Sequence, residues 1–171
     1  YWAGVVMQII IRAPFSMSTR SRIKAERHVS RTENTLLGLL TVAGLVLPLI
    51  YSVTNWLEFA NYTLSGWIGW IGVIILACGL LIFLRAHMDL KTNWSPTLEL
   101  YEGHSLITNG IYQHVRHPMY ASQLVLSIAQ LILLQNWIAG PACLIFFVPF
   151  YILRSRTEER MMLEKFRDQY L

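Results

Sequence analysis

The chain has 171 residues, of which 54% are hydrophobic and only 14% are charged, and its formal net charge at pH 7 is +4. A soluble domain of this length is usually nearer a quarter charged, and the mean hydropathy of +0.43 also argues against an ordinary soluble enzyme. Apolar stretches near membrane-spanning length recur along the chain. We therefore expect a polytopic membrane protein.

Five apolar runs follow one another along the chain, at 1–11, 36–53, 67–84, 119–134 and 137–153. The first is expected to be the end of a membrane helix that begins before Tyr1. Only Gln135 and Asn136 separate the last two runs, which predicts an antiparallel helical hairpin. The charged tail 154–171 places its apolar residues on one helical face, which predicts an amphipathic helix at the membrane surface.

The positive charges are confined to three polar segments. Because five spans alternate sides, residues 12–33, 85–118 and 154–171 are expected at one membrane face, and they hold all 14 Lys and Arg residues. The positive-inside rule makes that face cytoplasmic, in a bacterial inner membrane or the endoplasmic reticulum. This distribution accounts for the net positive charge, so binding of nucleic acid is not needed to explain it. The fold class we expect is all-α, a multi-pass integral membrane bundle of about five helices.

One polar stretch between the apolar runs carries most of the reactive side chains. It reads EGHSLITNGIYQHVRHPMY, from Glu102 to Tyr120. Pro118 suits the first turn of a helix, and a helix entrance presents unpaired N–H groups that favour an anion. Polar groups gathered where a membrane helix begins indicate a functional site.

Several other chemistries lack their sequence signatures. The chain contains no G-x-G-x-x-G, G-x-S-x-G, H-E-x-x-H or C-x-x-C pattern. The histidines at 104, 114 and 117 have no cysteine or well-spaced carboxylate beside them, so we expect no metal site. We expect His114 on the loop surface and a hydrogen-bonding role for His117.

The end of the last span offers a second group of charges. Hairpin geometry brings Arg154 towards Arg116, and two arginines repel one another unless an anion lies between them. A ligand carboxylate, supported by Glu159, is our hypothesis for that anion. Glu158 points about 100° away from Glu159 on a helix, and we expect it on a solvated face with Arg154 or Arg156.

These blocks match a known family. The run GHSLITNGIYQHVRHPMY, followed by Arg154 and TEERMMLEKFRDQY, resembles the isoprenylcysteine carboxyl methyltransferase family and, more distantly, the phospholipid methyltransferases. The resemblance covers 93–170 and is specific in the G-x-Y-x-x-x-R-H-P-x-Y block and in the double-glutamate block. Members of that family usually continue past the position of Leu171 with a short basic segment that helps to close the pocket.

The resemblance implies methyl transfer from S-adenosylmethionine to the carboxylate of a lipophilic, isoprenylcysteine-like substrate, at a cofactor pocket that faces the cytoplasm, without a metal. It implies a single domain 1–171, with N-terminal helices in 1–92 and the cofactor-binding and catalytic part in 93–171. The cofactor-binding residues it implies are His104, Leu106, Ile107, Tyr112, His117, Pro118, Tyr120 and Glu159. The catalytic residues it implies are Arg116, Arg154 and Glu159.

Two other enzyme classes and one non-enzymatic role remain as alternatives. A phospholipid or amine N-methyltransferase needs a base for its ammonium nucleophile, whereas a carboxylate is already ionised at neutral pH and needs only in-line placement and exclusion of water. A sterol-type NADPH reductase shares a related R-H-P block but carries many more spans. A small membrane scaffold would leave the polar stretch without a purpose.

Overall fold

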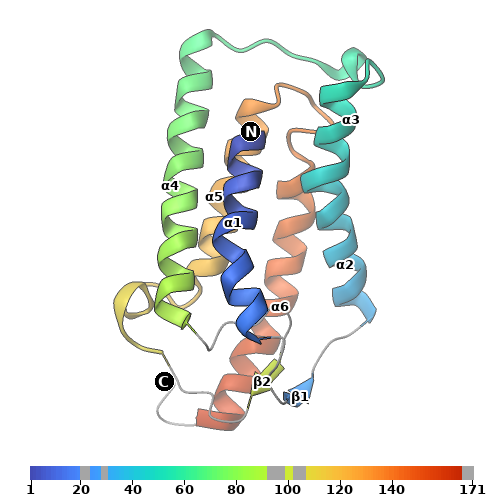
Figure 1. Cartoon of the computed structure of the whole chain (residues 1–171). Helices are drawn as coiled ribbons and strands as arrows, with labels where there is room; N and C mark the ends of the chain where they lie inside the picture. Colours follow the sequence, from blue (N-terminus) through green and yellow to red (C-terminus); the bar gives the residue numbers. More distant parts are fainter. Residues whose placement is uncertain (20–23, 28–30, 92–98, 102–106, 167–171) are drawn as a thin grey trace.

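The computed structural model describes residues 1–19, 24–27, 31–91, 99–101 and 107–166. Five long helical segments run up and down along a common direction (Figure 1). They are α1 (Trp2–Thr19), α2 (Arg31–Thr41) continued by the π-helical turn η1 (Val42–Val46) and α3 (Leu47–Val53), α4 (Gly66–Leu90), α5 (Pro118–Leu133) and α6 (Ala142–Phe166). The short turns η2 (Glu58–Ala60) and η4 (Gly110–Gln113) lie in the connections.

The predicted helical class is confirmed, and the structure adds one short ladder to it. Strand β1 (Lys24–Arg27) pairs antiparallel with β2 (Glu99–Tyr101). The two strands come from the two long polar connections, and they lie at the end of the bundle where α1 and α4 finish and where the C-terminal half of α6 extends (Figure 1). The ladder therefore ties together two segments that the sequence analysis assigned to the same membrane face.

The end of the last helix differs from the prediction. The charged segment after residue 153 is not a separate helix, because α6 continues without a break to Phe166. The helix also starts at Ala142, five residues later than the predicted position 137, because Trp137–Pro141 forms turns. A proline directly before a helix suits its entrance, since the ring fixes φ and removes a donor that the first turn cannot satisfy.

Asn136 holds the turn between α5 and α6. Its side chain is fully buried at 0% exposure, and its Oδ1 accepts the N–H groups of Ile138 and Ala139 at 3.0 and 2.9 Å. Its Nδ2 donates to the carbonyl of Leu57 at 2.7 Å and to Oδ1 of Asn61 at 2.8 Å. One amide thus closes the hairpin and fastens it to the connection between α3 and α4, because a buried polar group must find partners.

Two glycines let α4 approach α5 closely. A Cβ on Gly72 would come within 2.9 Å of Ile132 Cγ2, and one on Gly79 within 2.8 Å of Leu126 Cδ2. Gly69, on the same helix, has no neighbour within 4 Å. Close backbone approach through small residues is a common way for membrane helices to associate.

The helices also have the length and surface of a membrane protein. Among the described residues, Arg31–Val53 and Gly66–Leu90 are long and apolar enough to cross a membrane, and Trp2–Met17 and Pro118–Leu133 are apolar but shorter. Large hydrophobic side chains are exposed along the bundle, including Ile74 at 61% and Leu81 at 66%. A water-soluble protein rarely exposes so much contiguous apolar surface. The chain is therefore a membrane protein, and the full set of five spans stays a prediction.

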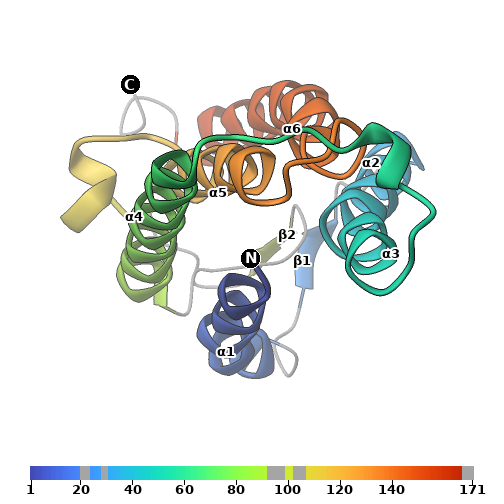
Figure 2. The same cartoon turned by 90° about the horizontal axis from the view of Figure 1, so that it is seen from above.

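Seen from above, α4, α5, α6 and the α2–α3 segment form an arc (Figure 2). Helix α1 lies across the open side of that arc, with β1 and β2 visible between it and the other helices. Hydrogen bonds at the start of α1 fix this arrangement. The Tyr1 hydroxyl donates to the carbonyl of Gly44, in η1, and contacts Oε1 of Gln130 at 3.1 Å. All five helical segments can therefore face one interior space.

Candidate functional site

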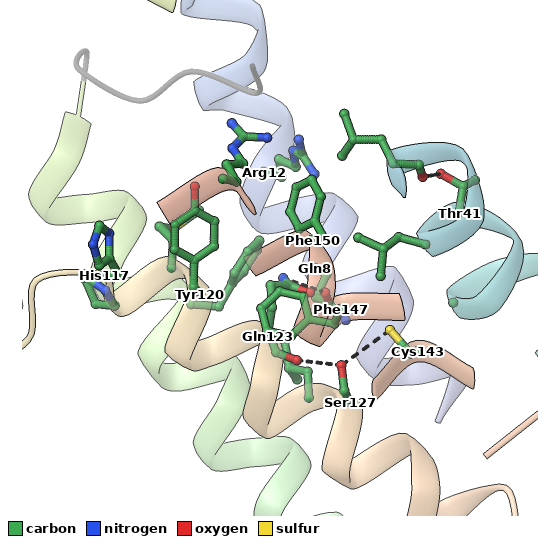
Figure 3. A pocket seen from close by; sticks show the side chains of 18 of the residues that line it. Gln8, Arg12, Thr41, His117, Tyr120, Gln123, Ser127, Cys143, Phe147 and Phe150 are labelled. Carbon is green, nitrogen blue, oxygen red and sulfur yellow. Dashed lines mark hydrogen bonds between the residues drawn. The ribbon is translucent and has the colours of Figure 1, made fainter. Parts of the chain in front are cut away.

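A cavity of about 470 Å³ lies inside the arc, and residues of α1, α2, η1, α4, α5 and α6 line it. One part of the lining is apolar, with Leu76, Leu126 and Phe147 among its members. Another part is polar and includes His117, Tyr120 and Arg154 (Figure 3). The cavity thus joins the entrance of α5, which the sequence singled out, to an apolar interior.

The start of α5 is bonded to the middle of α6. The Tyr120 hydroxyl donates to Oε2 of Glu158 at 2.6 Å, and Nε2 of His117 lies 3.1 Å from Oε1 of Glu159. A carboxylate only accepts, so Nε2 of His117 carries the hydrogen of that bond. The rings of His117, Tyr120 and Tyr151 contact one another in tilted and edge-to-face arrangements, with centroid separations of 5.5 to 6.4 Å. These contacts fix an aromatic and acidic surface at the polar end of the cavity.

Arg154 lies beside this surface and is only 8% exposed. Its Nη1 is 3.4 Å from Oε1 of Glu33, at the start of α2, and its guanidinium lies over the ring of Phe150 at 5.5 Å. A buried guanidinium is stabilised by a carboxylate and by the face of an aromatic ring. The sequence had suggested Glu158 as a partner of Arg154, and the structure instead pairs Arg154 with Glu33 and Glu158 with Tyr120.

A short turn before α5 carries Tyr112 into the cavity lining. The carboxylate of Asp89, near the end of α4, accepts the backbone N–H of Ile111 at 2.8 Å and the Nε–H of Arg85 at 3.1 Å. Gly110 has a φ of +63°, and a Cβ there would collide with Asp89. Glycine is needed at this position because it alone accepts both the backbone conformation and the contact. Asp89 therefore positions the turn that holds Tyr112.

Burial raises the pKa of the Tyr112 hydroxyl above its ordinary value, and the negative charges of Glu158 and Asp89 raise it further. Both effects disfavour the phenolate, because burial removes the water that would stabilise it and nearby carboxylates repel it. Tyr112 consequently remains a hydrogen-bond donor at neutral pH. Its hydroxyl suits an acceptor group on a ligand.

Five of the residues implied by the family resemblance line the cavity: Tyr112, His117, Pro118, Tyr120 and Arg154. Glu159 does not line it and reaches the site through its contact with His117, with 42% of its side chain exposed. His104 and Leu106 lie outside the described residues, and Ile107 is half-buried away from the lining.

The predicted approach of Arg116 to Arg154 is not found among the described contacts. Arg116 is exposed and does not belong to the cavity lining, although it directly precedes His117. His114 is exposed too, with Nε2 3.0 Å from the side-chain nitrogen of Gln113, as expected for a residue on the loop surface. Among the described residues no group of three His, Cys, Asp or Glu side chains could hold a metal ion.

Sequence reasoning placed Glu158 on a solvated face and gave no role to Asp89 or Arg12, whereas Glu158 and Arg12 line the cavity and Asp89 holds the turn beside it. The spacing of four residues had suggested that Glu158 shares a helix face with Arg154, but not that this face lines a cavity. Arg12 lies on α1 beyond the predicted end of its apolar run, and it was treated as part of a polar connection. The cavity therefore takes residues from 1–92 as well as from the part of the chain that was expected to be catalytic.

Comparison with known proteins gives a consistent result. A profile of the isoprenylcysteine carboxyl methyltransferase (ICMT) family matches residues 70–164. Protein-S-isoprenylcysteine O-methyltransferase A of Arabidopsis thaliana is 26% identical over 130 residues, which cover 75% of this chain and 66% of that protein. Protein-S-isoprenylcysteine O-methyltransferase of Dictyostelium discoideum is 30% identical over 132 residues, which cover 71% of this chain and 53% of that protein. The human protein of that name is 27% identical over 135 residues, which cover 77% of this chain and 46% of the human one.

The chain spans about half to two thirds of the length of these relatives. The family profile nevertheless covers more than half of the chain, from the beginning of α4 to near the end of α6. It includes Asp89, the turn with Tyr112, the start of α5 and the bonded segment of α6. The chain belongs to the isoprenylcysteine carboxyl methyltransferase family.

Proposed function

We propose that this protein transfers a methyl group from S-adenosylmethionine to the carboxylate of a lipophilic, isoprenylcysteine-like acid. The observation that carries this proposal is the composition of one cavity. Its polar end combines Tyr112, His117 and Tyr120 with the Glu158 carboxylate and the buried Arg154, and its remaining walls are largely apolar. A cationic donor, an anionic acceptor and a hydrocarbon tail can each find a complementary surface there.

The residues present fit the donor. Its sulfonium is a cation, and the Glu158 carboxylate with the rings of Tyr120 and Tyr112 offers the charge and the aromatic faces that favour one. The donor supplies the electrophilic methyl group. Pro118 begins α5 at the cavity, and the uncapped N–H groups of this first turn favour a carboxylate or another anionic group. His104, Leu106 and Ile107 stay predicted contacts from the family resemblance.

The acceptor side is assigned to Arg154. Its planar guanidinium can donate two parallel hydrogen bonds to a carboxylate, and Glu33 and Phe150 hold it in place. A carboxylate of ordinary pKa is ionised at pH 7, so the site needs no general base. The oxygen attacks the methyl carbon, the carbon–sulfur bond breaks with its electrons passing to sulfur, and an ester and a neutral thioether result.

The charges of the described residues suit this reaction. Arg12 and Arg154 contribute two positive charges to the polar end, and Glu158 in the lining and Glu33 beside Arg154 contribute two negative ones. A sulfonium bound with a carboxylate adds one charge of each sign. Since both charges disappear during transfer, a largely apolar cavity that excludes water favours the transition state over the charged reactants. The protein's task is then alignment.

We also propose that the polar end faces the cytoplasm and that all five helical segments span the bilayer. Support comes from the position of the basic segments. The ends of α1 and α4, the strands β1 and β2 and the C-terminal half of α6 lie at one end of the bundle (Figure 1). Trp56 and Trp137 are exposed and belong to the connections at the other end of the bundle, between α3 and α4 and between α5 and α6. Tryptophans at that position are typical of an interfacial aromatic belt. Labelling of a single cysteine introduced at Glu102 from the periplasmic or lumenal side would contradict this topology.

The proposed activity is tested with purified protein in lipid nanodiscs, S-adenosylmethionine labelled in its methyl group, and S-farnesylcysteine as acceptor. We expect labelled product that releases volatile methanol in alkali, because a methyl ester is hydrolysed and an N-methyl group is not. Phosphatidylethanolamine serves as the competing acceptor. Alkali-stable label on that lipid, with none on the acid, would replace the proposal with N-methylation. Binding of NADPH without binding of S-adenosylmethionine would favour a reductase.

A further inference from the structure

One face of α1 forms a wall of the cavity. Its lining residues are Tyr1, Val5, Gln8, Ile9 and Arg12, whose spacing of three and four places them on a single stripe of the helix. This wall lies outside residues 70–164, the part of the chain that matches the family profile. Gln8 and Arg12 are its two polar members apart from Tyr1, and both belong to the lining drawn in Figure 3.

Two side-chain contacts set the register between α1 and α5. Nε2 of Gln123 donates to Oε1 of Gln8 at 3.4 Å, and the Tyr1 hydroxyl lies 3.1 Å from Oε1 of Gln130. From Tyr1 to Gln8 and from Gln123 to Gln130 the chain advances by the same number of residues, so the two helices run antiparallel and in step. Continuing this register by one turn places Arg12 level with the start of α5, next to Tyr120.

Arg12 consequently lies at the end of the cavity that holds Arg154. The two guanidinium groups interact electrostatically with one another. Both line the cavity, Arg12 from α1 and Arg154 from α6, and these two helices lie on opposite sides of the interior of the arc (Figure 2). Arg116, the second arginine of the sequence hypothesis, is exposed and outside the lining. A carboxylate bound by Arg154 is thus placed to meet a second guanidinium from α1.

The amide pair of Gln8 and Gln123 lies one turn deeper than these charges. Four residues of helix separate Gln8 from Arg12, which corresponds to about 6 Å along the axis. The bond between the two amides is at the long limit for a hydrogen bond, and each amide has further donor or acceptor capacity. In a largely apolar cavity, a ligand group that supplies both a donor and an acceptor would stabilise this pair.

We propose that α1 completes the acceptor site: Arg12 binds the acceptor carboxylate together with Arg154, and the Gln8–Gln123 pair binds an amide group of the same acceptor about one helical turn deeper. This assignment rests on the proposed carboxyl methylation. It defines the preferred acceptor as a lipophilic acid that carries an amide a few bonds from its carboxylate, in addition to its apolar tail. The N–H of the ligand's amide would donate to a glutamine side-chain oxygen, and its carbonyl would accept from a glutamine side-chain NH₂ group.

The first experiment tests Arg12 with S-farnesylcysteine as the acceptor. Arg12→Gln should raise the acceptor KM about tenfold, and Arg12→Lys should raise it several-fold because lysine keeps the charge and loses the planar fork. The dissociation constant of S-adenosylmethionine, measured by calorimetry, should change less than twofold in both variants. Arg156→Gln, at an exposed position of α6, is the matched control and should keep the wild-type KM.

A normal acceptor KM in Arg12→Lys and Arg12→Gln would show that Arg12 is a membrane-anchoring cation, and the inference would be wrong. A raised acceptor KM in Arg116→Gln, with no change in the Arg12 variants, would show that Arg116 and not Arg12 is the second arginine that binds the carboxylate. Calorimetry with the donor shows whether each variant is folded, and Arg12→Lys keeps the test decisive if Arg12→Gln fails to fold. If wild-type protein methylates no acid at all, the proposed function fails and not merely this inference.

The second experiment tests the amide pair with two acids of equal chain length, N-dodecanoyl-β-alanine and hexadecanoic acid. Wild-type protein should methylate the amide acid with a KM several-fold lower than that of the plain acid. Gln8→Leu, which keeps the approximate volume of the side chain and removes its hydrogen bonds, should abolish this difference by raising the KM of the amide acid to that of hexadecanoic acid. Equal KM values in the wild type, or a preference that survives in Gln8→Leu, would overturn the amide subsite.

Discussion

The two walls of the cavity differ in how firmly their polar side chains are held. On the α5–α6 wall, Tyr120 is bonded to Glu158 at 2.6 Å and His117 lies 3.1 Å from Glu159. On the α1 wall, the hydrogen bond that Gln8 accepts from Gln123 is long, at 3.4 Å. The first wall is preorganised at its polar end, whereas the α1 wall is anchored at Tyr1 and held more loosely at Gln8. We infer that donor binding depends on the first wall and that acceptor selection depends more on the second.

The largest expected effect is at Arg154, on the α5–α6 wall. Arg154→Lys keeps the charge opposite Glu33 but cannot form the planar pair of hydrogen bonds with a carboxylate. We expect turnover to fall about a hundredfold, equivalent to about 2.7 kcal/mol of transition-state stabilisation. Donor affinity should change little. Initial rates of ester formation and calorimetry with S-adenosylmethionine measure the two quantities.

Arg156→Lys provides the control for this substitution, because Arg156 is exposed on the same helix. It should retain wild-type turnover. If Arg154→Lys also retained near-normal turnover, Arg154 would be only the structural partner of Glu33, and the assignment of the carboxylate to this guanidinium would fail.

The next largest effect separates the two neighbouring glutamates. Glu158→Gln removes the charge that Tyr120 stabilises inside the cavity, so donor affinity should fall about tenfold, or about 1.4 kcal/mol. Glu159→Gln should lower it by about threefold or less, because Glu159 is outside the lining and 42% of its side chain is exposed. Calorimetry compares the two. The reverse order would restore the functional role that the family resemblance gave to Glu159.

The sequence predicted the helical class and the start of α5 at Pro118. Both depend on local chemistry: long apolar runs, and a proline after a polar stretch. Tyr112, His117, Pro118 and Tyr120 were implied by the family resemblance, and all line the cavity.

What the sequence could not supply depends on the continuity and register of the helices. The choice between Glu158 and Glu159 required knowing that α6 passes straight through residue 153, because this fixes which of two adjacent carboxylates lines the cavity. Arg12 needed the register between α1 and α5, which no local pattern contains. The late start of α6 depends on the buried Asn136 and on Pro141. Residues 137–141 between them are mostly apolar, so the sequence analysis assigned them to the helix.

A smaller effect is expected at Asp89, which holds the turn that precedes α5 and carries Tyr112. Asp89→Ala removes the acceptor of the Ile111 N–H and loosens the turn that carries Tyr112. We expect the donor KM to rise about fivefold, or about 1 kcal/mol. Asp89→Asn keeps an oxygen acceptor and should stay within about twofold of the wild type. Equal losses in both variants would mean that the charge of Asp89 matters, and the positioning role assigned to its hydrogen bond would be wrong.

The smallest functional effect is expected where α4 supports α5 away from the cavity. In Gly72→Ala the new Cβ would lie 2.9 Å from Ile132 Cγ2, so the helices must separate slightly, and we expect a loss of about 1 to 2 kcal/mol in stability. Gly69→Ala, one turn earlier on the same helix, meets no neighbour within 4 Å and should be neutral or stabilising, because alanine favours a helix over glycine. Thermal unfolding in nanodiscs measures both variants, and turnover of the folded protein should remain normal in each. A clear fall in turnover for Gly72→Ala would show that the α5–α6 wall is less rigid than its hydrogen bonds indicate, since a small shift at the far end of α5 would then reach Tyr120 and Glu158.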